Sequence, residues 1–237
     1  MGRVHVTEII MTCLLLASLF MVNVNASDEN EVDDEHPFTY EENSERGPQH
    51  WGHLHPKWQT CETGHLQSPI DLLHARVELM SGPGDMKRTY RPSPAVIRNR
   101  GHDIMVQWTG DAGGLTINGR EYKMIQCHWH TPSEHHVDGR RKLIPHLKSV
   151  GEVGKNLGVV NPWDLKFGSG KYYRYNGSIT VPPCTEGVLW TVLKRVRTVS
   201  KEQLRALRDA VHDGFEDNAR PTQSWDGRSV YMYDPEL

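Results

Sequence analysis

The 237-residue sequence lacks an excess of charge of either sign. Its 27 Lys and Arg residues are balanced by 30 Asp and Glu residues, which gives a formal net charge of −3 with histidine neutral. General electrostatic binding to nucleic acid or to an anionic membrane needs a marked basic surplus. The composition therefore predicts no nucleic-acid partner and no membrane-surface partner, and it leaves the oligomeric state open.

The sequence also lacks an apolar run of the roughly 20 residues that a membrane-spanning helix needs. Its main apolar run, residues 14–22, follows a basic residue near the N-terminus and precedes small residues that end at Ala26. This pattern is typical of a secretory signal peptide, residues 1–26, and a membrane anchor is the alternative. The chain is expected to enter the secretory pathway, with no membrane association after cleavage.

Cysteine is scarce. Cys13 belongs to the predicted signal peptide, so Cys61, Cys127 and Cys184 remain in the mature chain. Three thiols in an oxidising compartment favour one disulfide and one free cysteine. Cys127 lies among hydrophobic neighbours in a predicted strand, where a buried thiol behaves as a small apolar group. A Cys61–Cys184 bridge is therefore expected, although the sequence alone allows the other pairings.

The chain is long enough for one sizeable domain, and its 14 Pro and 21 Gly favour a loop-rich fold that is mainly β with a few helices. Residues 27–49 are acidic and nearly free of aliphatic side chains, so they are expected to form an exposed lead-in. The folded domain is expected to span residues 50–237. The sequence contains no internal repeat.

Alternating apolar residues predict strands over residues 95–108, 114–130 and 187–196, and Asn118-Gly119 predicts a type I′ hairpin turn within the second range. Histidines 128 and 130 are expected on one face of that range, with Cys127 on the other. A helix is predicted to start at Ser200 with a capping box to Gln203. Its expected apolar stripe consists of Leu204, Leu207, Val211 and Phe215.

His128 and His130 are the first sign of a metal site. Residues two apart on a strand lie about 6.6 Å apart on one face, so two imidazoles can converge on one ion. Chance pairs also occur in a chain with 14 histidines. Glu134 adds a carboxylate four residues later, for which a solvated loop acid is the alternative. A catalytic zinc site usually has three protein ligands and one open position, so a third ligand is needed.

The range 172–192 combines a strand pattern, a Ser-x-Thr-x-Pro-Pro turn, Cys184 and Trp190. Together with the His-x-His strand it resembles the α-type carbonic anhydrases, and most closely their plant branch, which includes the yam tuber storage proteins called dioscorins. The resemblance covers nearly the whole mature chain in family order. It is carried by HWG at 50–52, QSPID at 67–71, NRGHDI at 99–104, QCHWHTPSEH at 126–135, GSITVPPCTEG at 177–187 and NARPTQ at 218–223.

The resemblance implies a large, mostly antiparallel twisted sheet with a zinc ion at the bottom of a conical cleft, and reversible hydration of CO2 to bicarbonate and a proton. His128 and His130 would be two of three zinc ligands, and Thr180 would accept a hydrogen bond from zinc-bound hydroxide. Glu134 would orient Thr180, and His102 would be the proton shuttle. The other implied roles are walls of the substrate pocket for Ile179, Val181 and Trp190, orientation of the ligand imidazoles for Gln126 and Asn218, and a disulfide for Cys61 and Cys184.

The third ligand of the family has no counterpart here. In the family, a strand with the pattern Glu-Leu-His-x-Val-His follows, and its first His is the missing ligand. Here Arg141 runs directly into residues that resemble a later helix and loop, so several dozen residues with interior strands are expected to be absent between 141 and 142. His146 is one possible replacement, but Pro145 is unsuited to a central strand and the spacing slips by one residue.

These patterns leave three interpretations of function. The chain is a carbonic anhydrase of low activity, a non-catalytic dioscorin-like storage or binding protein, or a poorly folding product of splicing or of a gene-model error. Asn176 lies in an Asn-Gly-Ser sequon next to the expected active-site turn, and burial there could block glycosylation.

Overall fold

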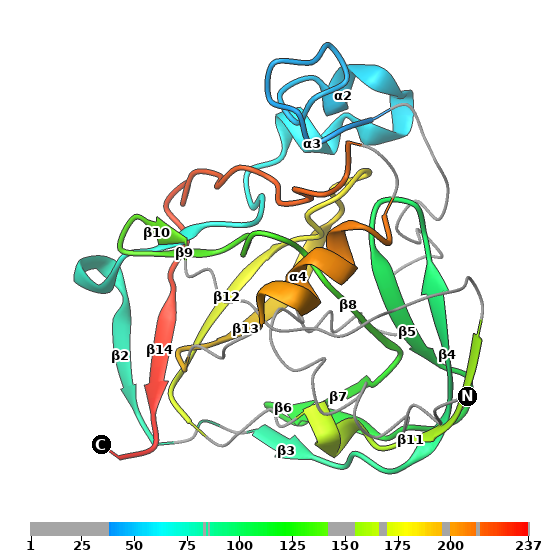
Figure 1. The fold of residues 1–237 in the computed structure, drawn as a ribbon. Helices are drawn as coiled ribbons and strands as arrows, with labels where there is room; N and C mark the ends of the chain where they lie inside the picture. Colours follow the sequence, from blue (N-terminus) through cyan, green and yellow to red (C-terminus); the bar gives the residue numbers. More distant parts are fainter. Residues whose placement is uncertain are drawn as a thin grey trace.

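The computed structural model describes residues 38–82, 84, 86–141, 155–165, 170–195, 200–211 and 214–236. The predicted signal peptide and His146 lie outside these residues. The chain is mainly β with a few short helices, as predicted (Figure 1). No helix among the described residues is long and apolar enough to cross a membrane.

Six short helical elements and fourteen strands make up the described fold. The helical elements are α2 (Trp51–Leu54), η1 (Pro56–Trp58), α3 (Thr60–Thr63), η2 (His74–Arg76), η3 (Pro162–Leu165) and α4 (Lys201–Arg208). The strands are β1 (Asp71–Leu72), β2 (Glu78–Ser81), β3 (Met86–Arg88), β4 (Ser93–Asn99), β5 (Ile104–Trp108), β6 (Gly114–Ile117), β7 (Arg120–Lys123), β8 (Gln126–His128), β9 (His136–Val137), β10 (Arg140–Arg141), β11 (Lys155–Val160), β12 (Tyr172–Ser178), β13 (Glu186–Leu193) and β14 (Tyr231–Asp234).

The strands form two four-stranded and two three-stranded sheets. The larger sheets have the orders β11-β4-β5-β8 and β13-β12-β14-β2, and the smaller ones β3-β6-β7 and β1-β9-β10. Figure 1 shows the two larger sheets on opposite sides of the molecule. The resemblance implied one large sheet; here β8 and β13 are the end strands of two separate sheets, within the part of the chain that the structure describes.

Three clusters of buried side chains form the core. The first lies between β4, β5, β8 and the β6–β7 hairpin and also receives Leu207 of α4. The second lies on β12, β13 and β14 and includes Tyr175 and Trp190. The third joins residues near the N-terminus to the turn after β12, through Trp51, Trp58 and the two cysteines 61 and 184.

The acidic lead-in is not exposed throughout. Phe38 and Tyr40 are 2% and 5% exposed, and the Phe38 ring makes edge contacts with Trp51 and Trp58 at centroid distances of 5.4 and 6.2 Å. The prediction of an exposed lead-in is therefore wrong for residues 38–40. Two aromatic side chains bury enough surface to anchor a segment whose overall composition is polar.

The predicted hairpin is confirmed, but the strand after it is divided. Asn118 and Gly119 have φ values of 49° and 76° between β6 and β7, as a type I′ turn requires. The predicted continuous strand breaks at Met124 and Ile125, because β7 pairs in the small sheet with β6 whereas β8 pairs with β5. Met124 is buried at this crossing and Ile125 is exposed.

The predicted helix start is also confirmed. Ser200 Oγ accepts a hydrogen bond from the Gln203 backbone N–H, and Gln203 Oε1 accepts one from the Ser200 N–H. The helix ends at Arg208, so Val211 and Phe215 lie beyond it and pack against two different core clusters. The predicted stripe is therefore helical only as far as Leu207.

Replacing Ser200 with Ala is expected to lower the free energy of unfolding by about 1 kcal/mol, because the Gln203 N–H loses its acceptor. Ser200→Asp is the matched control, since a carboxylate can accept the same hydrogen bond. Urea denaturation of the three proteins measures the effect. Equal stability of Ser200→Ala and the parent chain would show that the capping box does not contribute to the free energy of unfolding.

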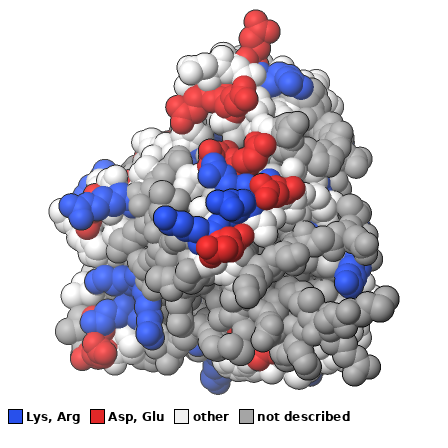
Figure 2. Space-filling view, in the orientation of Figure 1, with Lys and Arg blue, Asp and Glu red and all other residues white. Residues whose placement is uncertain are grey.

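The surface carries both signs of charge. On the face shown in Figure 2, the described residues include Lys, Arg, Asp and Glu side chains, and several of the basic ones lie next to acidic ones. Arg208 and Asp217 form one such ion pair beside α4, and Lys171 pairs with Asp234 and Glu236. Exposed pairs such as Arg208–Asp217 contribute about 0–1 kcal/mol each, so they do not determine the fold.

Candidate metal centre

His128 and His130 converge at the end of β8. Both side chains are buried, and their ring centroids are 5.0 Å apart. Glu134 lies next to them, with its Oε1 3.7 Å from His130 Nδ1, and its Oε2 accepts a 2.9 Å hydrogen bond from Thr180 Oγ1. The structure therefore brings together the four side chains that were predicted to meet.

Hydrogen bonds set the direction in which the two imidazoles point. His128 Nδ1 lies 2.9 Å from Gln126 Oε1, and His130 Nδ1 lies 2.6 Å from the Asn218 backbone oxygen. A carbonyl acceptor at Nδ1 requires the proton there, which leaves Nε2 with its lone pair. His130 Nε2 is buried without a hydrogen-bond partner, as a nitrogen prepared to bind a metal would be.

The donor set is nevertheless incomplete for catalytic zinc. Within the described ranges, no group of three or more His, Cys, Asp or Glu side chains is arranged to hold a metal ion. A catalytic zinc site normally takes three protein ligands. The residues present fit two of these positions, and His146 lies outside the described residues.

Burial and hydrogen bonding orient the Glu134–Thr180 pair. Burial raises the pKa of the Glu134 carboxyl, while the nearby His130 and the Thr180 hydroxyl oppose that shift. The Glu134 carboxylate also accepts a long 3.4 Å hydrogen bond from the Arg220 backbone N–H. Because the Thr180 hydroxyl donates its proton to Glu134, its oxygen can only accept a further hydrogen bond.

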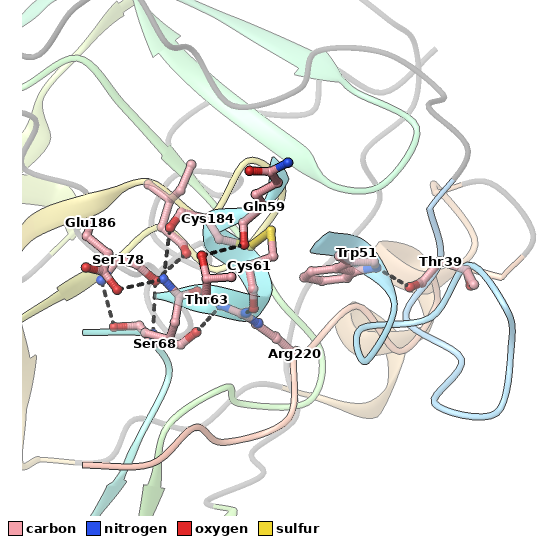
Figure 3. Close-up of a disulfide and its surroundings, with 12 residues drawn as sticks. Thr39, Trp51, Gln59, Cys61, Thr63, Ser68, Ser178, Cys184, Glu186 and Arg220 are labelled. Atoms are coloured by element: carbon pink, nitrogen blue, oxygen red, sulfur yellow. Dashed lines mark hydrogen bonds between the residues drawn. A yellow bond between two sulfur atoms is a disulfide. The ribbon is translucent and has the colours of Figure 1, made fainter. Parts of the chain in front are cut away.

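A disulfide holds the turn that carries Thr180. Cys61 on α3 is bonded to Cys184, as predicted, with a Cα–Cα distance of 4.9 Å (Figure 3). Cys127 is buried and takes no part in a disulfide, also as predicted. Arg220 Nη2 donates to the Cys61 backbone oxygen, and its Nη1 donates to Ser68 O and Gln67 Oε1. Arg220 was not singled out from the sequence, although it lies within the NARPTQ motif.

His102 lies in an unexpected environment for a proton shuttle. Its side chain is 2% exposed, and its ring makes an edge contact with Phe38 at a centroid distance of 5.7 Å. A shuttle must exchange protons with water. The neighbouring Asp103 is buried too, and although burial alone would raise its pKa, the charges of Arg100 and of His102 hold that pKa well below its usual range. The shuttle role therefore stays a prediction that this conformation does not favour.

The three residues expected to line the substrate pocket are buried in the core. Ile179, Val181 and Trp190 are 6%, 3% and 1% exposed. Ile179 and Trp190 belong to the cluster on β12 and β13, whereas Val181 packs in the cluster near the N-terminus. The described residues thus show packed apolar side chains at these positions and not an open wall.

His135 is a buried histidine that the sequence did not single out. Its Nε2 lies 2.6 Å from the Tyr175 hydroxyl, and its ring packs edge-on against Trp190 at 4.7 Å. Burial, with smaller contributions from the charges of His136 and His130, lowers the pKa of His135 to about 3. The folded chain therefore keeps His135 neutral at a pH where the unfolded chain protonates it.

Stability is expected to fall as the pH drops below about 6.5, the ordinary pKa of a histidine. Between that value and about 3, the unfolded chain binds a proton at His135 that the folded chain does not bind. One such proton changes the free energy of unfolding by up to about 1.4 kcal/mol per pH unit. His135→Leu should flatten the pH profile of urea denaturation between about pH 6 and pH 4. His50→Gln, at an exposed position, should leave that profile unchanged. A parallel profile for His135→Leu would contradict the assignment.

The fold and the paired histidines are those of the α-type carbonic anhydrase family. The family model for eukaryotic-type carbonic anhydrases matches residues 46–144 and 140–234, and the chain belongs to this family. It is 49% identical to alpha carbonic anhydrase 4 of Arabidopsis thaliana, over 88% of this chain and 90% of that protein. It is 37% identical to dioscorin dioA3 of Dioscorea japonica, over 93% of each chain.

Solved structures agree with this assignment. The crystal structure of dioscorin complexed with ascorbate aligns with a TM-score of 0.78 and 36% identity, over 83% of this chain and 98% of that one. A hyperthermostable carbonic anhydrase from a hydrothermal vent chimney aligns with a TM-score of 0.70 and 28% identity, over 83% of this chain and 100% of that one. The chain therefore has the fold that these solved structures share.

Proposed function

We propose that this chain is a secreted carbonic anhydrase whose zinc-dependent hydration of CO2 is impaired by loss of the third zinc ligand. The observation that carries the proposal is the buried pair His128 and His130, which no third metal-binding side chain joins within the described residues. Two ligands and water hold zinc far more weakly than a complete set of three.

The alignments support a missing interior segment. The family model matches in two stretches that meet at residues 140–144, next to the abrupt junction between Arg141 and Lys142. The alignment with the 49%-identical relative runs over 241 positions, and 88% of the 237 residues here is about 209, so about 32 positions have no residue in this chain. A segment of that length can hold two strands and the third ligand.

The remaining residues keep parts of the family chemistry. Zinc, when bound, supplies a hydroxide at neutral pH by lowering the pKa of a bound water. His128 and His130 would hold the ion through Nε2, and Gln126 and the Asn218 backbone would fix their orientation. The Thr180 hydroxyl donates its proton in a hydrogen bond to Glu134, so its oxygen would be left to accept a hydrogen bond from the reacting group and hold that group in one orientation.

Zinc binding tests the proposal. Purified, monodisperse chain dialysed in a zinc buffer is expected to hold well below one zinc per chain, measured by mass spectrometry of the metal. His128→Ala should remove the residual zinc, whereas His53→Ala, at an exposed site paired with Glu62, should leave it unchanged. One tightly bound zinc per chain would overturn the claim of a lost ligand.

A second candidate is a non-catalytic storage or ligand-binding role. It is favoured by the 37% identity to a dioscorin and by the TM-score of 0.78 to the dioscorin–ascorbate structure. Calorimetric titration with ascorbate separates the two candidates, because binding without zinc and without hydratase activity supports this one. Aggregation and a non-cooperative unfolding curve would instead support a poorly folding product.

A further inference from the structure

The sequon Asn176-Gly177-Ser178 occupies the end of β12. The seven residues of this strand are buried except for Asn176, whose side chain is exposed. No hydrogen bond joins the Asn176 side-chain amide to any residue in the described ranges. Its backbone oxygen accepts a 3.2 Å hydrogen bond from Arg228 Nη1, so the strand is held at this point while the side chain stays accessible.

The pairing of β12 explains this exposure. β13 lies along one side of β12 over its whole length, but β14 pairs only with residues 172–174. Asn176 therefore lies past the last residue that β14 covers. Its cross-strand neighbour on β13 is Leu189, which is itself only partly buried.

Strand alternation directs Asn176 away from the packed face. Tyr175, its neighbour, stacks on Trp190 at a centroid distance of 6.2 Å, and His135 packs against the same tryptophan. At Gly177 a Cβ atom would lie 2.2 Å from Ser68 Oγ and 2.8 Å from the Trp190 ring, so that side has no room for any side chain. Successive side chains of a strand point to opposite faces, so Asn176 points away from this cluster.

We propose that Asn176 carries an N-linked oligosaccharide. Asn-x-Ser with any residue but Pro in the middle is the acceptor pattern, and a bulky sugar is tolerated only at an exposed position. The transfer forms a bond between Asn176 Nδ2 and the anomeric carbon of an oligosaccharide on a polyprenyl pyrophosphate carrier. The bond from that carbon to the pyrophosphate breaks, and the carrier leaves together with the amide proton.

The folded structure also indicates when the transfer takes place. Ser178 is fully buried, its Oγ donates to the Ile179 oxygen at 2.7 Å, and it accepts from the Ser68 N–H at 3.0 Å. The transferring enzyme must reach this hydroxyl as part of the sequon. The sugar is therefore added to the unfolded chain on entry into the secretory pathway, and folding then places it on the surface.

The test expresses the full chain in a eukaryotic secretory cell, in parallel with residues 27–237 behind a heterologous signal peptide. Peptide N-glycosidase in heavy-oxygen water converts an occupied Asn176 to a mass-tagged aspartate that peptide mass spectrometry detects. Most of the chain is expected to carry the tag. The attached sugar should also slow the chain on a denaturing gel. This shift should disappear in Asn176→Gln and persist in Asn25→Gln, which removes the sequon Asn25-Ala26-Ser27.

Two results would overturn the proposal. One is that most of the chain expressed with the heterologous signal peptide has an unmodified Asn176 peptide. This fraction is measured in both the medium and the cell lysate, so that chain retained in the cell is included. The other is a glycosylated chain that melts well below its enzymatically deglycosylated form, because an outward-facing sugar should not disturb the core. The proposal depends on entry into the secretory pathway and not on zinc binding or CO2 hydration, so those assays cannot affect it.

Discussion

Purified, monodisperse chain is expected to hydrate CO2 more than about 100-fold more slowly than its 49%-identical Arabidopsis relative. Loss of a residue that only orients a zinc ligand typically lowers metal affinity or activity by about 10–100-fold, so loss of a ligand should cost more. His128 is also the last residue of β8, an end strand of its sheet within the described residues, and His130 lies two residues beyond that strand. Small displacements of His128, His130 and Thr180 relative to one another lower the rate further.

Stopped-flow CO2 hydration with zinc measured alongside checks this expectation. Any residual rate should be abolished by His130→Ala and blocked by a sulfonamide, and His53→Ala is the matched surface control. A sulfonamide-sensitive rate close to that of the relative, with one zinc per chain, would contradict it. His146→Ala would then be the next variant, because His146 is the imidazole nearest in sequence to the missing ligand.

The elements that were predicted correctly depend on contacts between near neighbours. The Asn118-Gly119 turn and the Ser200–Gln203 capping box each act over a few residues, so their chemistry can be recognised in the sequence. The division of the strand at Met124 and Ile125 could not be predicted in this way. It depends on two different partner strands, β6 and β5, and alternation within one segment does not identify its partners.

The burial of the N-terminal aromatic residues and of His102 depends on distant contacts. Phe38 packs against His102 at 5.7 Å and against Phe215 at 5.6 Å, which joins three parts of the chain that are far apart in sequence. The acidic composition of the segment around Phe38 predicted that it is exposed, and the resemblance to the family predicted that His102 is a proton shuttle. Neither prediction could take into account the contact between Phe38 and His102, which forms only in the folded chain.

The sequence predicted which residues form the candidate site but not which residues hold them in place. The family motifs identified His128, His130, Glu134 and Thr180, and the structure brings them together. The role of Arg220 depends on contacts that form only in the folded chain. Its guanidinium bonds to backbone oxygens of Cys61 and Ser68, and its own backbone N–H reaches Glu134. One buried residue thereby links the disulfide region to the site, through its side chain on one side and its backbone on the other.

Removing the disulfide with Cys61→Ser and Cys184→Ser is expected to lower the free energy of unfolding by about 2–5 kcal/mol. The bridge joins residues separated by 123 positions, and closing a loop of this length restricts the unfolded chain strongly. The folded state loses contacts as well, because Cys61 and Cys184 are both buried in the cluster that contains Trp51 and Trp58. Since a domain has only about 5–15 kcal/mol of net stability, this loss can unfold much of the population at elevated temperature.

Guanidinium denaturation measures this loss, with the parent chain in dithiothreitol as the chemical equivalent of the double variant. Cys127→Ala is the control, because it removes a buried thiol without opening the bridge. Opening the bridge should also affect the candidate metal centre. Cys184 is bonded to α3, and its backbone N–H donates to Val181 O in the turn that carries Thr180. Reduced protein should therefore bind zinc more weakly than oxidised protein under conditions where both are folded. Equal stability of the oxidised chain and the double variant would contradict this role for the bridge, whereas equal zinc affinity with lowered stability would confine the effect to the N-terminal cluster.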